Sequence, residues 1–134
     1  MKKVLTVGVF DLLHFGHIEL FRKARGQGDY LIVAVQSSEN VLKYKPSSKL
    51  VYNTDERCYM VSAIRHVDEV VVYDDVDSVV RQVDFDVFVK GPDQSHGGFQ
   101  NAVRYCRENG KEVVELPRTE GISTSEIKRY IKSK

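Results

Sequence analysis

Five short apolar runs recur along the chain, each bounded by polar residues or glycine. They cover residues 3–9, 30–35, 69–73, 85–89 and 111–116. Valine and other β-branched residues are frequent in these runs, which favours strands, and continuous apolar character is typical of strands covered on both faces. The pattern therefore predicts five buried β-strands.

Segments with helical spacing separate these strands. The first opens at His17 and stops at residues 25–28, and the second begins with Thr54 as its N-cap. The other three cover residues 76–83, 100–109 and 123–131. Strands that alternate with helices imply right-handed crossovers. We therefore predict the α/β class: a single doubly wound, Rossmann-like domain over residues 1–134, with a parallel five-stranded sheet and helices on both faces. Ligands of such sheets bind beyond the carboxyl ends of the strands, where the strand order reverses.

Charge and composition narrow the classes of partner. The 134 residues carry 20 Lys and Arg against 19 Asp and Glu, a net charge of +1. Without a basic excess, we expect neither a nucleic-acid nor a membrane partner, and any bound anion needs a local cluster of donors. The apolar start stops at Asp11, too early for a signal peptide, and no run approaches the ~20 residues of a membrane span. Cys58 and Cys106 suit core positions rather than a disulfide framework. These features predict a cytoplasmic protein.

The first candidate cluster follows the first strand and reads FDLLHFGH, residues 10–17. His14 and His17 stand three positions apart across Gly16, and the helix that follows presents free N–H groups. Two imidazoles there suit an anionic ligand. A metal pair is an alternative, but no third ligand stands at a suitable spacing. A second alternative is that one histidine is a helix cap.

Two further clusters lie in connections that follow strands. Arg118 precedes Ser123 and Thr124 in RTEGISTS, where hydroxyls suit a helix N-cap and the guanidinium suits phosphate oxygens. Lys43 and Lys45 lie in the polar stretch 37–53, which is longer than most connections. A capped helix and a solvated lysine run are the alternative interpretations. A lysine that closes on a polyphosphate is the functional one.

Taken together, VGVFDLLHFGH, the loop lysines, NTDERCYMVSAIRHVDEVV and RTEGISTSEIKRYI resemble the cytidylyltransferase family. Within that family the likeness is strongest to the small bacterial glycerol-phosphate enzymes. It extends over nearly the whole chain and preserves the motif order. The resemblance implies transfer of CMP from CTP to a small alcohol or polyol phosphate, with release of pyrophosphate. It also implies Mg²⁺ held mainly by the nucleotide phosphates, with no predicted protein ligands, and a homodimer.

The resemblance also assigns roles to individual residues. Those expected to act in catalysis are His14, His17, Lys43 and Arg118. Those expected to bind the nucleotide are Val9, Phe10, His14, His17, Lys43, Asp93, Arg118, Thr119, Ile122, Ser123 and Thr124. Those expected near the acceptor are Asp11, Lys45, Arg57, Arg65 and His96, with Asp11 also suited to shaping the turn.

Two departures from the glycerol-phosphate pattern leave an alternative open. Val9 replaces a threonine of the motif, and the chain has no tryptophan where those enzymes carry an Asp-Asp-Trp element. The corresponding stretch begins Lys90-Gly91-Pro92-Asp93, which is similar to the Lys-Gly-Gly-Asp of heptose-phosphate adenylyltransferases. The alternative function is therefore an adenylyltransferase that acts on a sugar phosphate.

Overall fold

The computed structural model describes residues 1–92, 94, 96–117 and 131. Its elements are β1 (Lys3–Gly8), α1 (Phe15–Arg25), β2 (Tyr30–Gln36), α2 (Ser38–Tyr44), α3 (Thr54–Ser62), β3 (Glu69–Tyr73), α4 (Val76–Gln82), β4 (Val87–Lys90), α5 (Gly97–Glu108) and β5 (Glu112–Glu115). The predicted last helix, 123–131, lies outside the described residues except for Ile131. None of the helices in the described ranges combines the length and apolar character that a membrane crossing requires.

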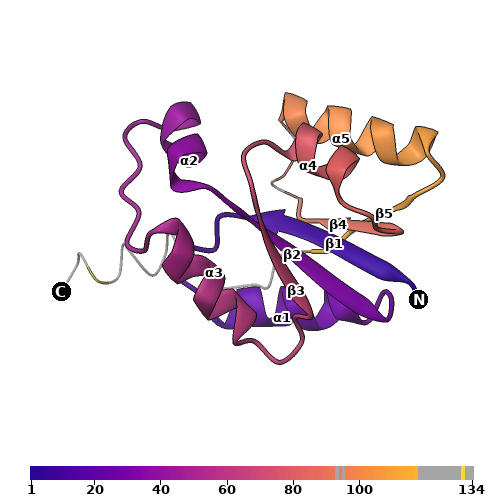
Figure 1. The fold of residues 1–134 in the computed structure, drawn as a ribbon, viewed down its shortest axis with the longest axis horizontal. Helices are drawn as coiled ribbons and strands as arrows, with labels where there is room; N and C mark the ends of the chain where they lie inside the picture. Colours follow the sequence, from indigo (N-terminus) through magenta and orange to yellow (C-terminus); the bar gives the residue numbers. More distant parts are fainter. Residues whose placement is uncertain (93, 95, 118–130, 132–134) are drawn as a thin grey trace.

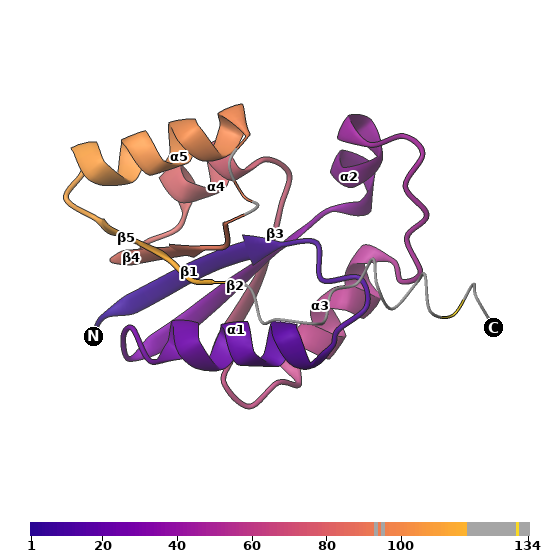
Figure 2. The same ribbon diagram turned by 180° about the vertical axis from the view of Figure 1, so that it is seen from behind.

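The five strands form one parallel sheet in the order β3-β2-β1-β4-β5. Helices α1 and α3 cover one face, and α4 and α5 cover the other (Figure 1, Figure 2). A hydrophobic core lies between the sheet and the helices on each face, and the central strands contribute to both. In β1, Val4 belongs to the core on the α1 side and Leu5 to the core on the α4–α5 side. This confirms the predicted doubly wound architecture.

The order of strands reverses between β1 and β4. The crossover after β1 runs through α1 on one face, whereas the connections into and out of β4 run through α4 and α5 on the other. The chain therefore leaves the carboxyl ends of these two neighbouring strands in opposite directions, which opens the sheet edge between them to a ligand. The residues that follow β1 and β4 belong to this edge.

One sequence prediction about the connection after β2 is wrong, and the connection contains a helix that the sequence analysis did not indicate. Residues 37–53 contain a short helix, α2, with Ser37 as its N-cap. Val41 is the residue that α2 buries, so no apolar periodicity marked the helix. The N-cap of α3 is Asn53, not Thr54: Asn53 Oδ1 accepts from the Glu56 N–H at 2.8 Å, and Glu56 Oε1 accepts from the Asn53 N–H at 3.0 Å. Such a reciprocal capping box satisfies two otherwise unpaired N–H groups.

Helix α5 also begins earlier than its apolar spacing indicated. It starts at Gly97, with His96 as its N-cap, rather than at Gln100. Two glycines have low helix propensity, and the sequence pattern therefore placed the start after them. Here the His96 side chain offsets that cost, because its Nδ1 accepts from the Gly98 N–H at 3.1 Å.

Candidate functional site

The turn after β1 carries backbone strain. Phe10 has a φ of 53°, in the left-handed region that a bulky residue rarely adopts, yet its ring is buried. The ring packs edge-on against Phe21, with centroids 5.1 Å apart, and against His17 at 5.5 Å. Core packing therefore holds the strained turn, and the same ring contacts one of the two histidines.

Gly8 makes room for that ring. A Cβ at Gly8 would lie 2.7 Å from Phe10 Cζ, closer than real contacts allow. We expect Gly8→Ala to lower the free energy of unfolding by about 1–3 kcal/mol, because the buried ring must shift. Gly97→Ala is the control, since a Cβ there meets nothing within 4 Å. Urea unfolding of both variants checks this, and equal stabilities would contradict it.

Both histidines take part in the N-terminal cap of α1. His14 is the N-cap, and its Nδ1 accepts from the Gly16 N–H at 3.0 Å. His17 Nδ1 accepts from the His14 N–H at 3.3 Å. A neutral imidazole that accepts through Nδ1 carries its proton on Nε2. The cap alternative is thus correct for His14, and it leaves an Nε2–H donor on each ring.

The two rings lie against each other, with centroids 3.9 Å apart and planes 27° apart. Burial, and secondarily the neighbouring His14, lowers the pKa of His17 to about 4; burial also lowers the pKa of His14. Both rings are therefore neutral donors near pH 7. Protonation of either Nδ1 would also break the cap, because a protonated nitrogen no longer accepts a hydrogen bond.

This pKa makes stability depend on pH. In the unfolded chain His17 has an ordinary pKa near 6.5, so between pH 6.5 and 4 the unfolded state binds a proton that the folded state does not. Stability should therefore fall as pH falls, by about 2 kcal/mol from this residue between pH 7 and 5. Urea unfolding at both pH values measures the loss. The loss should be smaller in His17→Gln, and an unchanged loss would contradict the assignment.

Asp11 anchors the far end of the connection after β2. Its buried carboxylate accepts from the Val51 N–H at 2.9 and 3.1 Å and from the Tyr52 N–H at 2.9 Å. The turn-shaping role suggested for this residue is thus visible, extended to a segment about 40 positions away. Its predicted contact with the acceptor stays a prediction.

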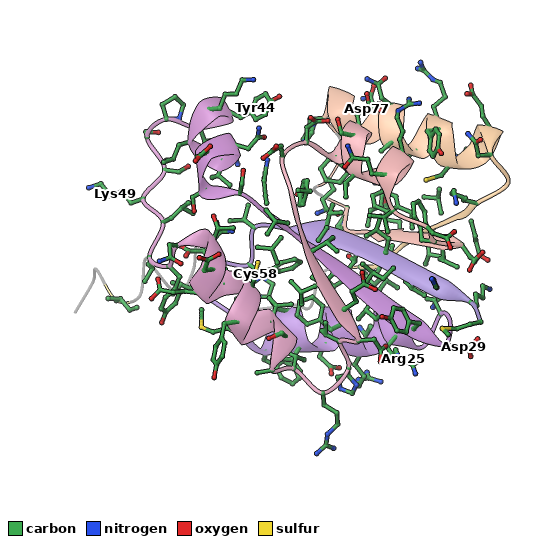
Figure 3. The ribbon with its side chains drawn as sticks, viewed as in Figure 1. Arg25, Asp29, Tyr44, Lys49, Cys58 and Asp77 are labelled. Carbon is green, nitrogen blue, oxygen red and sulfur yellow. The ribbon has the colours of Figure 1, made fainter. Side chains whose placement is uncertain are left out.

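The predicted lysines lie on and beside α2, which rises from the carboxyl end of β2 (Figure 1). Lys43 is in the last turn of α2, exposed, with its Nζ 5.7 Å from the centre of the Tyr44 ring. Lys45 is the C-cap and is exposed as well. Tyr44 and Lys49 project outward from this part of the chain (Figure 3). The lysines therefore stand on the carboxyl edge of the sheet, as predicted.

The residues expected near the acceptor are not all brought together. Arg57 is fully buried, and each of its five N–H groups has a partner in the protein, so it presents no donor to a ligand in this structure. Arg65 follows α3 in an exposed turn that leads to the amino end of β3. It therefore lies at the amino ends of the strands, whereas His14 lies at their carboxyl ends. His96 is at the carboxyl edge, where it caps α5.

Gln94 belongs to the same edge and was missed by sequence analysis. Its Nε2 donates to the Val7 carbonyl at 2.9 Å, and its Oε1 accepts from the Gly91 N–H at 3.0 Å. These bonds fasten the connection after β4 to β1, across the point where strand order reverses. A glutamine in a loop gives no pattern that indicates this role.

Several predicted positions lie outside the described residues. They are the nucleotide-binding candidates Asp93, Arg118, Thr119, Ile122, Ser123 and Thr124. Of the others, Val9 is partly buried, and its carbonyl accepts from Arg57 Nη1. The described part of the site therefore comprises the histidine turn, the α2 lysines and the connection after β4.

Comparisons with known proteins agree with these features. A family model described as cytidylyltransferase-like matches residues 5–130. A glycerol-3-phosphate cytidylyltransferase of Staphylococcus aureus is 44% identical, with 100% of this chain and 98% of the relative covered. One of Bacillus subtilis is 43% identical, with 98% of each covered. A lipopolysaccharide core biosynthesis protein of Thermoplasma volcanium has a TM-score of 0.71 at 24% identity, over 89% of this chain and 97% of that one, which supports the fold.

Proposed function

The chain belongs to the cytidylyltransferase-like family, and from that membership we propose that it transfers a cytidylyl group from CTP to glycerol phosphate. A phosphate oxygen of the acceptor attacks the α-phosphorus of CTP and forms a new P–O bond. The bond from that phosphorus to the bridging oxygen of the β-phosphate breaks, and pyrophosphate leaves with the electron pair. The product is CDP-glycerol. The acceptor phosphate is already an anionic nucleophile, so no covalent enzyme intermediate is needed.

The observation that carries this proposal is the pair of Nε2–H donors at the N-terminus of α1. His14 and His17 use Nδ1 for the cap, and their Nε2–H groups remain for phosphate oxygens. Donors that are already oriented stabilise charge that develops in the transition state without reorganising. The helix N-terminus adds the positive end of its dipole. Lys43 is proposed to contribute a cation from α2, and Lys45 to help hold the acceptor.

Mg²⁺ is proposed to accompany the nucleotide. Among the described residues, no group of three or more His, Cys, Asp or Glu side chains is arranged to hold a metal ion. The described donors at the carboxyl ends of the strands include imidazole and ammonium groups, which suit phosphate oxygens. When bound to those oxygens, Mg²⁺ would neutralise part of the charge on the departing pyrophosphate.

The test is pyrophosphate release from CTP or ATP, with glycerol 3-phosphate and a panel of other polyol, amino-alcohol and sugar phosphates. We expect turnover with CTP and glycerol 3-phosphate, lowered at least tenfold by EDTA and restored by Mg²⁺. Turnover with ATP and a sugar phosphate, and none with CTP, would instead establish the alternative function. Release from neither nucleotide would contradict both.

We also propose a cytoplasmic homodimer. A nucleoside triphosphate substrate is a cytoplasmic metabolite, which supports the location. The edge strand β3 exposes 53% of Val72, and Tyr59 of α3 is exposed as well, so a second copy has apolar surface to cover. Sedimentation equilibrium measures the assembly, and a monomer at micromolar concentration would contradict the dimer.

A further inference from the structure

The Arg57 guanidinium joins segments that are far apart in the sequence. Its side chain has no exposed surface, and its pKa is lowered by that burial. All five N–H donors of the fork have an oxygen acceptor in the protein. The acceptors are the carbonyls of Val9 (2.8 Å), Gln36 (2.8 Å) and Tyr52 (3.2 Å) and the hydroxyls of Ser38 (2.8 Å) and Thr54 (3.4 Å).

These acceptors belong to the elements that carry the site. Val9 immediately precedes the strained Phe10 and the histidine turn. Gln36 is the last residue of β2, and Ser38 is the first of α2. Tyr52 is at the other end of the connection. Segment 37–53, here called the lysine segment, is thus fastened at both of its ends by a single side chain.

Two further contacts support the same anchorage. Asp11 accepts from the N–H groups of Val51 and Tyr52, so the end that receives Arg57 Nε also receives a carboxylate from the histidine turn. At the other end, Thr54 Oγ1 donates to Ser38 Oγ at 3.0 Å and accepts from the Ser38 N–H at 2.9 Å. Between the anchors, Leu42, Lys43, Tyr44, Lys45 and Lys49 are exposed.

We propose that Arg57 is a positioning residue. It fixes the lysine segment relative to the histidine turn, so that Lys43 and the two imidazoles can contact the same phosphate groups. The roles of those three residues rest on the proposed function. A planar fork with five donors can hold carbonyls of three separate segments at once. A lysine in the same place offers three donors on one nitrogen and lacks the reach to all of them.

The first test does not depend on activity. Trypsin cleaves after Lys43 and Lys49 but not after Lys45, because Pro46 follows it. We expect Arg57→Lys to speed cleavage at these two sites at least tenfold, and more than it speeds cleavage elsewhere. Arg25→Lys is the matched control, because Arg25 contacts Gly28 and Asp68 at the opposite edge of the sheet. Urea unfolding of each variant separates local release from lost global stability.

The result that overturns the proposal is equal acceleration at all sites, because the variant would then be only globally unstable. If Arg57→Lys does not fold, Ser38→Ala replaces it. That change removes one acceptor of the guanidinium and leaves the arginine in place. It should accelerate cleavage at Lys43 and Lys49 in the same selective way, to a smaller extent, and uniform cleavage would again count against the proposal.

The second test is a kinetic double-mutant cycle. Arg57→Lys alone should lower kcat about tenfold or more, because small displacements of a positioned group are costly. If Arg57 acts through Lys43, adding Arg57→Lys to Lys43→Ala should lower kcat less than threefold further. Full additivity would overturn the coupling to Lys43. An inactive wild-type protein would refute the proposed function, and the proteolysis would still decide whether Arg57 holds the segment.

Discussion

Replacing His17 with glutamine should lower kcat about 10²–10³-fold while leaving the fold and its thermal stability almost unchanged. Glutamine is a natural residue for the third position of a helix, where its side-chain oxygen accepts from the N-cap N–H as His17 Nδ1 does here. The cap is therefore kept, and the imidazole Nε2–H is replaced by an amide NH₂, a weaker donor that stacking on the His14 ring no longer orients towards the phosphates. An alanine at this position would remove both the cap and the imidazole donor, so a loss of stability could not be separated from a loss of catalysis.

The partner change is His14→Asn. Asparagine is among the strongest N-cap residues, so it can replace the bond from the Gly16 N–H. It also exchanges the second imidazole Nε2–H for an amide donor that no ring stacking orients. We expect a kcat loss of similar size. Because the two rings stack with their centroids 3.9 Å apart, their contributions are coupled. The kcat loss of the double variant should therefore be smaller than the product of the two single losses.

The control is His66→Gln, which changes a histidine at the opposite edge of the sheet. It should retain wild-type kcat. Steady-state kinetics with CTP and glycerol 3-phosphate, together with a thermal melt of each variant, make the comparison. Near-wild-type kcat in His17→Gln would remove this residue from the mechanism, whatever the stability of the variant.

Changing Lys43 to alanine should lower kcat about 10²-fold, with the KM for the acceptor changed less than threefold. The ammonium group is proposed to contact the nucleotide phosphates, where its charge matters most as pyrophosphate departs. The residue is exposed on α2 and buries nothing, so its loss should leave stability unchanged.

Lys49→Ala is the matched control for this change. It removes the same kind of side chain from the same segment, at a position that projects outward (Figure 3). We expect kcat within about twofold of wild type for this variant. Equal losses in both variants would indicate a general effect of charge on the segment. An unchanged kcat in Lys43→Ala would transfer the proposed role to Lys45.

The strands and the position of the site followed from the sequence because both depend on local pattern. Continuous valine-rich runs such as 30–35 must be covered on both faces, and helices between them leave a parallel sheet as the arrangement that does so. The histidine motif directly follows the first strand. A parallel sheet puts it at the carboxyl edge without further information.

The bounds of the helices and the presence of short elements were harder to predict from the sequence, because contacts between side chains decide them. Helix α2 buries Val41 and has no apolar face to read. The Asn53–Glu56 box could have been recognised by its spacing, but Thr54 is an equally good cap by type. In the structure Thr54 instead bonds Ser38 on another helix, and that contact is invisible in the local sequence.

What the sequence determined by itself is thus the fold class, the family and the end of the sheet at which the candidate site lies. The local cap of α1 decided which nitrogen of each imidazole is left for a ligand, because backbone N–H groups within three positions occupy Nδ1. Tertiary structure decided the environment of Arg57. Its acceptors come from positions up to 48 residues away, and a charged side chain becomes a buried anchor only where folding brings enough oxygens together to satisfy every donor.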